Sequence, residues 1–457
     1  MHDEMLSVDP TSRLKIVHVI PFFVPEGVGG AQHTVNDLAF ESSQRHDVSV
    51  ITWSGRCVDS EPKIEERGAF TVHWLGSLPR ISHVTVSETP EIDESFKRVI
   101  ETIVPDVVHL HQLSGVSANL IGISKDCARV VVVNLHDYLN ICPTDTIDFN
   151  GRLCFQPGFK CFSCLNPDMF SRRRLLGYWK LTNPIMVLFG RICGRSTRLG
   201  RLVEALSTRK KIYFDALKNA DALIAPSKAL ANVYLEAGLA AESISVIPPG
   251  IKAPQRSFGL RDCQDKLRFG FIGNHRVKGL TLLLRAFSQL DTKDAELLLY
   301  TDLRSYPPDV GREAARLTAD PRVRILERFS PDEADDVYGS FDVLVAPSIW
   351  VEPFGLVAAE AVIRGMPVIA ADSSGFEEVV KDGVNGLLFR RGDVQSLKLA
   401  MQRLVSDRGL VKELQANCGV AKTIDRYAIE VEGLYWTCLK KRTTRQISND
   451  PFPQSAL

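Results

Sequence analysis

Short apolar runs rich in β-branched residues alternate with segments of helical period along the first half of the chain. The runs occupy 15–20, 48–52, 70–75, 107–110, 130–134, 222–225 and 244–247. Segments such as 92–103, in which apolar residues recur three and four positions apart, separate them. Strands that alternate with helices in this way form a doubly wound parallel sheet. The first half is therefore predicted to be an α/β domain.

The same alternation begins again after a polar stretch. Pro248-Pro249-Gly250 ends the first pattern, and further apolar runs follow at 267–272, 296–299, 323–326, 343–346, 368–370 and 387–389. A pattern that restarts after a linker indicates a second domain. We expect two Rossmann-like domains, at 14–253 and 266–425, joined by a linker at 254–265. A C-terminal helix is expected at 426–442, with tails at 1–13 and 443–457.

Length and charge narrow the class of protein. A chain of 457 residues is too long for one core, and its 55 basic and 55 acidic residues give no net attraction to nucleic acid. No apolar run approaches the roughly 20 residues that span a bilayer. Residues 1–13 lack the apolar core of a secretory signal. We expect a cytoplasmic protein with reduced cysteines.

The stretch from Ser348 to Ala361 carries the strongest candidate chemistry. It joins a predicted buried strand to a helix, so that the first helical turn presents the backbone N–H groups of Phe354, Gly355 and Leu356. Such a turn suits an anion such as a diphosphate. Glu352 precedes the helix and Glu360 lies two turns along it, so two carboxylates can accept hydrogen bonds from hydroxyls at the two ends of one ligand. A nucleotide sugar has that pattern; the alternative is a pair of solvated surface glutamates.

This stretch resembles the E-x7-E motif of the family 4 retaining glycosyltransferases, and the resemblance continues through 365–370, 374–379 and 382–389. It implies the GT-B fold, in which two Rossmann-like domains enclose a cleft. It also implies that Glu352 contacts the donor sugar, that Glu360 binds the ribose, and that Phe354 to Leu356 hold the diphosphate. Ser374 departs from the motif, because the family often has glycine there.

Two further loops resemble parts of the same family. The loop from Gly273 to Gly279 resembles its donor-phosphate element, which implies a cation role for Lys278, and Arg276 is assigned as a substitute because Asn274 stands where the family has arginine. The Gly29-Gly30 loop resembles the family's glycine loop near the donor phosphate and acceptor; a plain turn is the alternative.

Two predicted strands end in histidines, and the two histidines are given different roles. The resemblance implies that His136 faces the donor sugar, whereas His109 is interpreted as structural.

Four cysteines form a separate group. Cys142, Cys154, Cys161 and Cys164 lie in a turn-rich insertion at 140–168, and the last two are spaced like a zinc knuckle. The overall spacing matches no standard zinc finger. It admits a structural zinc, an iron–sulfur cluster or thiols that bind no metal.

Basic residues concentrate at 170–215 among Trp, Tyr and aliphatic residues. This composition suits the surface of an anionic membrane, so the expected location includes the inner membrane face; a solvated helical cover is the alternative.

These features together predict a retaining glycosyltransferase of polysaccharide biosynthesis that moves a hexose-like sugar from a nucleotide donor to a glycan or lipid-linked acceptor bound by the N-terminal domain. Retention is implied by the resemblance alone. Catalysis is expected to need no cofactor, and the Asp-x-Asp motif of metal-dependent transferases does not occur. The alternatives are an epimerase or phosphorylase of the same fold and a non-catalytic, metal-bearing interaction protein.

Overall fold

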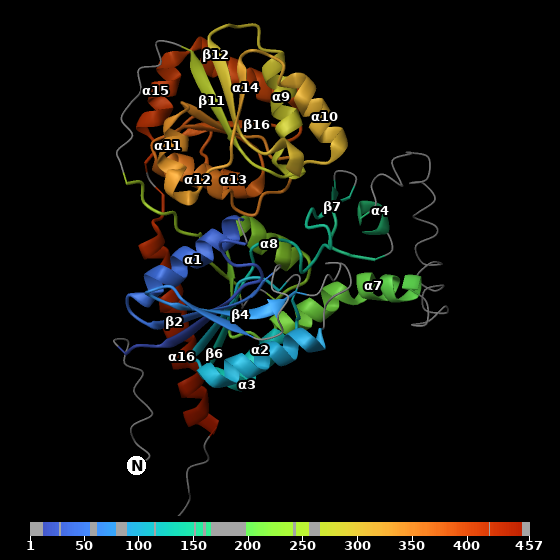
Figure 1. Ribbon diagram of the computed structural model, residues 1–457, viewed down its shortest axis with the longest axis vertical. Coiled ribbons are helices and arrows are strands. Elements are labelled where there is room, and N and C mark those ends of the chain that lie inside the picture. Colours follow the sequence, from blue (N-terminus) through green and yellow to red (C-terminus); the bar gives the residue numbers. More distant parts are fainter. Residues whose placement is uncertain are drawn as a thin grey trace, which may run out of the picture. The chain divides into compact units, whose positions relative to one another are not determined.

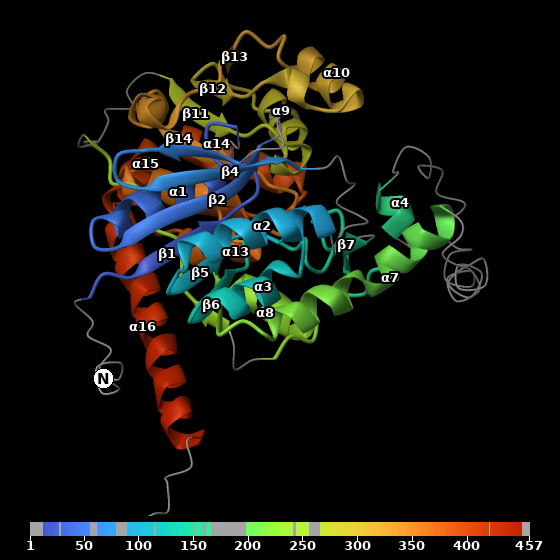
Figure 2. The same cartoon turned by 60° about the horizontal axis from the view of Figure 1, so that its bottom comes forward.

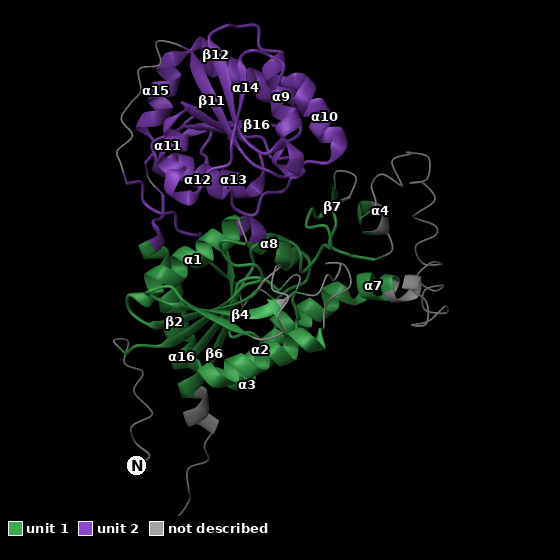
Figure 3. Ribbon diagram, viewed as in Figure 1, with its two compact units in different colours: residues 1–226, 231–247, 425–457 green, residues 227–230, 248–424 purple. Residues whose placement is uncertain are grey.

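The computed structural model describes residues 12–26, 29–54, 62–78, 89–113, 116–149, 152–158, 161–165, 198–240, 244–255, 266–419 and 421–449. The chain divides into two compact units (Figure 3). Unit 1 comprises 1–226, 231–247 and 425–457, and unit 2 comprises 227–230 and 248–424. Each unit is built around a sheet of its own.

The sheet of unit 1 has eight strands in the order β10-β9-β6-β5-β1-β2-β4-β3. Neighbouring strands are parallel except for β3, which pairs antiparallel with β4 at the edge. The strands are β1 (Lys15–Val19), β2 (Asp47–Ser54), β3 (Lys63–Glu66), β4 (Thr71–Ser77), β5 (Val107–Leu110), β6 (Val130–Asn134), β9 (Ala222–Ala225) and β10 (Ile244–Val246). The sequence did not predict β3, because its four residues Lys-Ile-Glu-Glu carry almost no apolar signal. A small hairpin, β7 (Asp148–Phe149) and β8 (Arg152–Leu153), was not predicted either.

The helices of unit 1 follow the expected periodicity. In α2, Pro90 occupies the first turn and Ile92, Phe96 and Ile100 recur every four residues on the buried face. The described helices are α1 (Gly30–Ser43), α2 (Pro90–Ile103), α3 (Leu120–Cys127), α4 (Cys161–Leu165), α7 (Arg198–Leu217), α8 (Lys228–Glu236) and α16 (Ile424–Asn449). The first three residues of α8 are grouped with unit 2.

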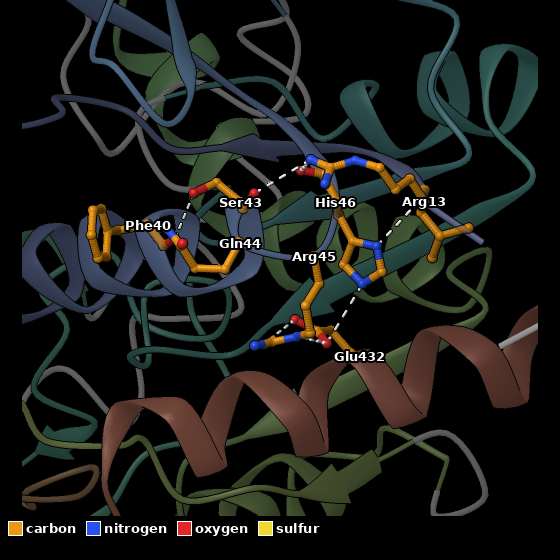
Figure 4. A network of polar contacts seen from close by, with 8 residues as sticks. Arg13, Phe40, Ser43, Gln44, Arg45, His46 and Glu432 are labelled. Atoms are coloured by element: carbon orange, nitrogen blue, oxygen red, sulfur yellow. Dashed lines mark hydrogen bonds and ion pairs between the residues drawn. The ribbon is translucent and has the colours of Figure 1, made fainter. Parts of the chain in front are cut away.

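Helix α16 returns from the end of the chain and packs on the sheet of unit 1 (Figure 2). The Tyr435 hydroxyl lies 2.7 Å from His109 Nδ1. Glu432 binds Arg45 through both oxygens, at 2.9 and 2.8 Å, and its Oε2 lies 3.5 Å from His46 Nε2 (Figure 4). The Glu432 side chain is only 8% exposed, so the paired arginine compensates a nearly buried charge.

Unit 2 contains a six-stranded sheet in which every pair of neighbours is parallel (Figure 1). The order is β13-β12-β11-β14-β15-β16. The strands are β11 (Leu267–Ile272), β12 (Ala295–Tyr300), β13 (Val323–Leu326), β14 (Val343–Ala346), β15 (Val368–Ala371) and β16 (Gly386–Phe389). The helices are α9 (Leu280–Ser288), α10 (Pro308–Leu317), α11 (Ala334–Gly339), α12 (Leu356–Ile363), α13 (Ser374–Val379), α14 (Val394–Ser406) and α15 (Arg408–Ala416), with short 3-10 turns η2 (Arg276–Lys278), η3 (Leu303–Ser305) and η4 (Pro331–Glu333).

Helices cover both faces of the unit 2 sheet, and the strands alternate between two cores. In β12, Leu297 and Leu299 pack with α9, α10, α14 and α15, whereas Leu298 packs with α11, α12 and α13. Strands buried on both faces account for the continuous apolar runs in the sequence. Two doubly wound α/β domains, as predicted, are confirmed.

None of the helices in the described part of the chain has the length and apolar content needed to cross a bilayer.

Candidate functional site

The candidate donor site of unit 2 forms where two neighbouring parallel strands end. Strands β11 and β14 are paired, and the loops at their carboxyl ends, 273–279 and 347–355, contact each other. The Val277 carbonyl accepts hydrogen bonds from Ile349 N at 2.9 Å and from Ser348 Oγ at 3.1 Å. Gly279 has φ +79°, and a Cβ there would lie 1.9 Å from the Pro347 carbonyl oxygen. Only glycine permits this approach, so the sequence itself brings the two loops together.

Glu352 and Lys278 meet across these loops. Lys278 Nζ lies 2.6 Å from Glu352 Oε1 and 5.3 Å from the centroid of the Trp350 ring. Glu352 is 5% exposed, and its second carboxylate oxygen, Oε2, is buried without a hydrogen-bond partner in the described part of the chain. A buried charged oxygen without a donor is costly, by about 1–3 kcal/mol or more. The carboxylate is therefore prepared to accept a hydrogen bond from a ligand.

The backbone around Glu352 is fixed from the loop that follows β15. Glu352 N donates to Ser373 Oγ at 2.8 Å, and Gly375 N donates to the Glu352 carbonyl at 3.1 Å. A Cβ on Gly375 would lie 2.3 Å from that carbonyl oxygen, so glycine is required here as well. Ser374 begins α13 beside this contact. The departure from the family motif at Ser374 therefore leaves the backbone support of Glu352 intact.

Helix α12 begins at Leu356, directly after the left-handed residue Gly355, which is three positions beyond Glu352. Gly355 has φ +93°, and a Cβ there would lie 2.4 Å from the Phe376 ring. The first backbone hydrogen bonds of the helix run from Ala358 N and Ala359 N to the Gly355 carbonyl. The preceding N–H groups, including those of Phe354 and Leu356, thus lie at the positive end of the helix, next to Glu352 and Lys278. This combination suits an anion.

Glu360 is held in place from α11. Tyr338 donates its hydroxyl to Glu360 Oε2 at 2.6 Å, and the Arg364 guanidinium lies over the Tyr338 ring at 4.9 Å. Burial, together with the adjacent Glu360 carboxylate, raises the pKa of Tyr338 well above its usual value, so the hydroxyl stays a donor. Glu360 is half-buried and shares its helix with the turn at Gly355. Both predicted carboxylates are therefore positioned by α12, Glu352 just before the helix and Glu360 on it.

Residues of the loop after β11 have different roles: Gly273 and Asn274 stabilise the loop, whereas Arg276 and Lys278 are the cations of the candidate site. The Gly273 carbonyl accepts hydrogen bonds from Thr301 and Tyr306 hydroxyls, and Asn274 Oδ1 accepts one from Asp302 N at 2.7 Å. Asn274 is thus committed to the loop itself. Arg276 is exposed within η2, two residues before Lys278.

In unit 1, the predicted glycine loop begins α1. Gly29 is the extended residue that precedes the helix, and Gly30 is its first residue. A Cβ on Gly29 would lie 2.5 Å from Gln32 Oε1, a contact that a shift of the flexible glutamine side chain relieves. Local packing therefore does not by itself require glycine at this position.

Three buried histidines, His18, His109 and His111, and the half-buried His136 form a group on the face of the sheet that α16 covers. His18 and His109 are register partners on β1 and β5. His18 Nδ1 lies 2.9 Å from His111 Nε2, and His111 Nδ1 lies 3.4 Å from His136 Nε2. His18, His109 and His111 also offer nitrogens within 4.8 Å of one another. Their mutual hydrogen bonds and the one to Tyr435 already use most of these nitrogens, so we interpret the group as a hydrogen-bonded chain.

Burial determines the charge of these hydrogen-bonded histidines. It lowers the pKa of His18 to about 3, against a smaller opposing effect of Glu432, and it lowers the pKa of His136 to about 4. All members are therefore neutral near pH 7. His18 Nε2 is buried and has no hydrogen-bond partner in the described part of the chain. Leaving an acceptor lone pair unpaired at this nitrogen costs less free energy than leaving an N–H donor unpaired. We accordingly assign hydrogens to Nδ1 of His18, His111 and His136, so that His136 presents an Nδ1–H donor.

The sequence missed several members of these sites. His18 and His111 resembled ordinary strand residues, although two parallel strands carrying histidine at matching positions is a usable signal. Tyr338, Trp350 and Ser373 act through contacts over long sequence distances, for which a single sequence offers no sign.

The four predicted metal ligands lie in unit 1, in the segment that follows β6. Residues 170–197, more than half of the predicted basic segment 170–215, lie outside the described residues. In its described part, Arg209 is 2% exposed and donates to the Leu139 carbonyl at 3.0 and 2.7 Å, and Lys210 donates to the Ala237 carbonyl. These two cations serve the fold of unit 1.

Comparison with known proteins finds a family match within unit 2. Residues 266–407 match the family model described as "Glycosyl transferases group 1". An uncharacterized glycosyltransferase of Methanocaldococcus jannaschii, MJ1607, is 31% identical over 178 residues, which cover 38% of this chain and 44% of that protein. A D-inositol 3-phosphate glycosyltransferase of Rhodococcus jostii is 36% identical over 155 residues, 32% of this chain and 34% of that protein. The matches thus span less than half the length of these relatives.

Solved structures resemble nearly the whole chain. Anabaena Alr3699/HepE in complex with UDP-glucose has a TM-score of 0.58 at 17% identity, covering 95% of this chain and 100% of that one. Sucrose-phosphate synthase from Thermosynechococcus elongatus has a TM-score of 0.61 at 19% identity, covering 95% and 98%. At such identities the likeness shows the fold, and the expected GT-B architecture is confirmed. The family match and this fold together support a glycosyltransferase.

Proposed function

We propose that this protein is a retaining glycosyltransferase of family 4 that transfers a sugar from a nucleotide-diphosphate donor to an acceptor. The observation that carries the proposal is the Glu352 carboxylate, buried with one oxygen on Lys278 and the other unpartnered in the described chain, at the start of helix α12. A sugar hydroxyl would satisfy the second oxygen.

The diphosphate of the donor would bind beside this carboxylate. The N–H groups around Gly355 and the Lys278 ammonium provide partial and full positive charge at adjoining positions. Arg276 would add a further cation from η2. As the C1–O bond of the sugar breaks, negative charge grows on the leaving diphosphate, and fixed positive groups favour that state over the ground state. The acceptor oxygen would bond to C1 on the same face, and its proton would pass to the diphosphate.

Glu360 would bind the ribose hydroxyls of the donor. Glu360 is the fifth residue of α12, little more than one turn beyond the proposed diphosphate turn at Gly355, and Tyr338 fixes its carboxylate. One of the two solved structures named above supports this class of ligand by analogy, since the Anabaena protein is in complex with UDP-glucose. The nucleotide base and the sugar of the present protein are left to experiment.

Unit 1 would contribute the acceptor side. His136, which is neutral near pH 7, would donate an N–H to the donor sugar, and the Gly29-Gly30 start of α1 would let an acceptor or phosphate approach the backbone. We propose a glycan or lipid-linked glycan as the acceptor. The basic residues of 170–215, apart from Arg209 and Lys210, which bind backbone carbonyls of unit 1, would attract an anionic membrane. The transfer itself would need no cofactor.

The test is a screen of nucleotide sugars against the purified protein, with binding followed by calorimetry and donor cleavage by release of nucleotide. Binding and slow cleavage of one donor support the proposal. Formation of an epimerised sugar nucleotide, or of a sugar phosphate with inorganic phosphate, would replace it with an epimerase or a phosphorylase. Absence of binding for every donor would favour a non-catalytic protein.

A further inference from the structure

Helix α12 is followed by Arg364, a buried cation that has no part in the proposed transfer step. Its side chain is 6% exposed, and its Nε lies 2.8 Å from Asp335 Oδ1 on α11. Its Nη1 donates to the Glu360 carbonyl at 3.0 Å, and its guanidinium covers the Tyr338 ring. A flat guanidinium with several N–H donors can make these three contacts together, whereas a lysine ammonium cannot. The position therefore specifies arginine.

The contacts of Arg364 determine where Glu360 lies. The hydrogen bond to the Glu360 carbonyl fixes the backbone of that residue. The Tyr338 ring is confined by the guanidinium and directs its hydroxyl to Glu360 Oε2 at 2.6 Å. Arg364 thus restrains both the backbone and the carboxylate of the residue that is proposed to bind the ribose.

Asp335 connects Arg364 to the segment at 251–255, which we call the entry segment. The second carboxylate oxygen of Asp335, Oδ2, accepts a hydrogen bond from the backbone N–H of Gln255 at 2.8 Å. The Asp335 side chain is 17% exposed, so its ion pair with Arg364 is largely shielded from solvent. One carboxylate therefore joins the backbone of the entry segment to the arginine at the end of α12.

The entry segment also packs against the start of α12. Ile251 is 5% exposed and forms a small apolar cluster with Phe354 and Ala359. Its N–H donates to the Lys422 carbonyl at 2.8 Å, and its carbonyl accepts the N–H of Ile424 at 3.1 Å. Phe354 belongs to the proposed diphosphate turn. The entry segment is therefore held at both ends of the helix that carries Glu360.

We propose that Asp335 and Arg364 are positioning residues for the nucleotide, which hold Glu360 through Tyr338 and couple it to the entry segment. The proposal rests on the proposed function, in which Glu360 binds the ribose. Since coupling between two sites is reciprocal, a nucleotide that fixes Glu360 also stabilises the entry segment, and an ordered entry segment favours nucleotide binding.

Calorimetry with UDP, ADP and GDP and with their 2′-deoxy forms tests the positioning role. The wild type should bind its preferred ribonucleotide at least about tenfold more tightly than the deoxy form, because the 2′-hydroxyl donates to the charged Glu360. In Asp335→Asn and Arg364→Lys this preference should fall to about threefold or less, since the carboxylate is no longer held at the ribose. A purely structural effect would weaken both forms equally and leave the preference unchanged.

Asp332→Asn is the matched control. Asp332 lies on η4 with its side chain 86% exposed, and its carboxylate is 3.8 Å from Lys252 Nζ of the entry segment. The substitution removes an exposed ion pair and leaves the pair of Asp335 with Arg364 in place, so the ribose preference should stay at the wild-type value. Retention of the preference in Asp335→Asn and Arg364→Lys, or its equal loss in Asp332→Asn, would overturn the proposal.

A double substitution tests whether the effect passes through Tyr338. If it does, Asp335→Asn combined with Tyr338→Phe should raise the dissociation constant of the ribonucleotide about as much as Tyr338→Phe alone, by about fivefold. Multiplication of the two separate effects would show that Asp335 acts independently of Tyr338 and would overturn the proposal.

Hydrogen exchange in the wild type needs no variant to fold. Saturation with the preferred ribonucleotide should slow exchange of the amides of Ile251, Lys252 and Gln255 by at least about threefold, whereas α15, which packs in the other core of unit 2, should change less. Unchanged exchange in the entry segment would overturn the coupling and leave the proposed function standing. A wild type that binds none of the nucleotides would remove the proposed function, and this inference with it.

Discussion

Lys278 Nζ lies 2.6 Å from Glu352 Oε1, while Glu352 Oε2, in the same buried carboxylate, has no hydrogen-bond partner in the described part of the chain. One half of the charge is therefore compensated by the protein and the other half is not. Such an arrangement costs stability. The unpaired oxygen favours ligand binding, because a ligand hydroxyl that donates to Oε2 would remove this free-energy cost.

Removing the ammonium should expose this cost. We expect Lys278→Met to lower the free energy of unfolding by about 1–3 kcal/mol, because Glu352 then stays buried without its cation. Adding Glu352→Gln should restore most of the loss without restoring activity. Urea denaturation measures both. Lys266→Met, which removes an exposed pair with Glu296, is the matched control and should change stability by less than about 1 kcal/mol. Equal stability of Lys278→Met and wild type would contradict the pairing.

The turn at Gly355 should not tolerate a side chain. Gly355→Ala combines φ +93° with a contact of 2.4 Å to Phe376, so we expect donor binding to weaken at least about tenfold as the helix start shifts. Gly383→Ala is the matched control: it has φ +70° but no atom within 4 Å of the new Cβ. It should lose stability and retain donor affinity. Similar donor affinities for the two variants would show that the turn does not bind the donor.

The sequence predicted the parts of this site that lie close together along the chain. Glu352, Gly355 and Glu360 are linked by strand, loop and helix periodicity, so their common placement follows from local rules. The contact of Lys278 with Glu352 depends on which strands are neighbours in the sheet. The histidine chain depends on the register of β1 with β5 and on the return of α16. Single-sequence patterns do not encode such pairings, which is why His18, His111 and Tyr338 were missed.

The hydroxyl of Tyr338 should matter for nucleotide binding more than for the chemical step. Tyr338→Phe removes the 2.6 Å hydrogen bond to Glu360 and keeps the ring under Arg364. We expect the dissociation constant of the donor to rise about fivefold, equivalent to about 1 kcal/mol, with kcat within about twofold. Isothermal calorimetry and steady-state kinetics measure these separately. A large fall in kcat at unchanged affinity would place Glu360 elsewhere in the mechanism.

The buried histidines should make unit 1 sensitive to acid. Their pKa values are lowered in the folded state, to about 3 for His18 and about 4 for His136, whereas an unfolded histidine titrates near 6.5. Below pH 6.5 the unfolded chain therefore binds protons that the folded chain excludes. The free energy of unfolding should fall by up to about 1.4 kcal/mol per pH unit for each such histidine as the pH decreases from 6.5 toward 4.

Replacing one histidine checks this assignment. His18→Gln keeps a polar side chain near His111 and should reduce the slope of stability against pH by about one proton in that range. His73, on β4 next to the edge strand β3, is the comparison: burial lowers its pKa as well, but it lies outside the histidine group, so His73→Gln should reduce the slope less than His18→Gln does. An unchanged slope in His18→Gln would mean that His18 is protonated in the folded protein.

The most direct test of the proposed chemistry is the transfer rate of Glu352→Gln with the donor identified by screening. The variant keeps the shape of the side chain and removes the charge beside the reacting sugar, so we expect kcat to fall at least about 100-fold, while circular dichroism and nucleotide binding persist. Glu313→Gln, at an exposed ion pair of α10 with Arg285, should transfer at the wild-type rate. Transfer by Glu352→Gln at a near-normal rate would contradict the assignment of this carboxylate to the donor sugar.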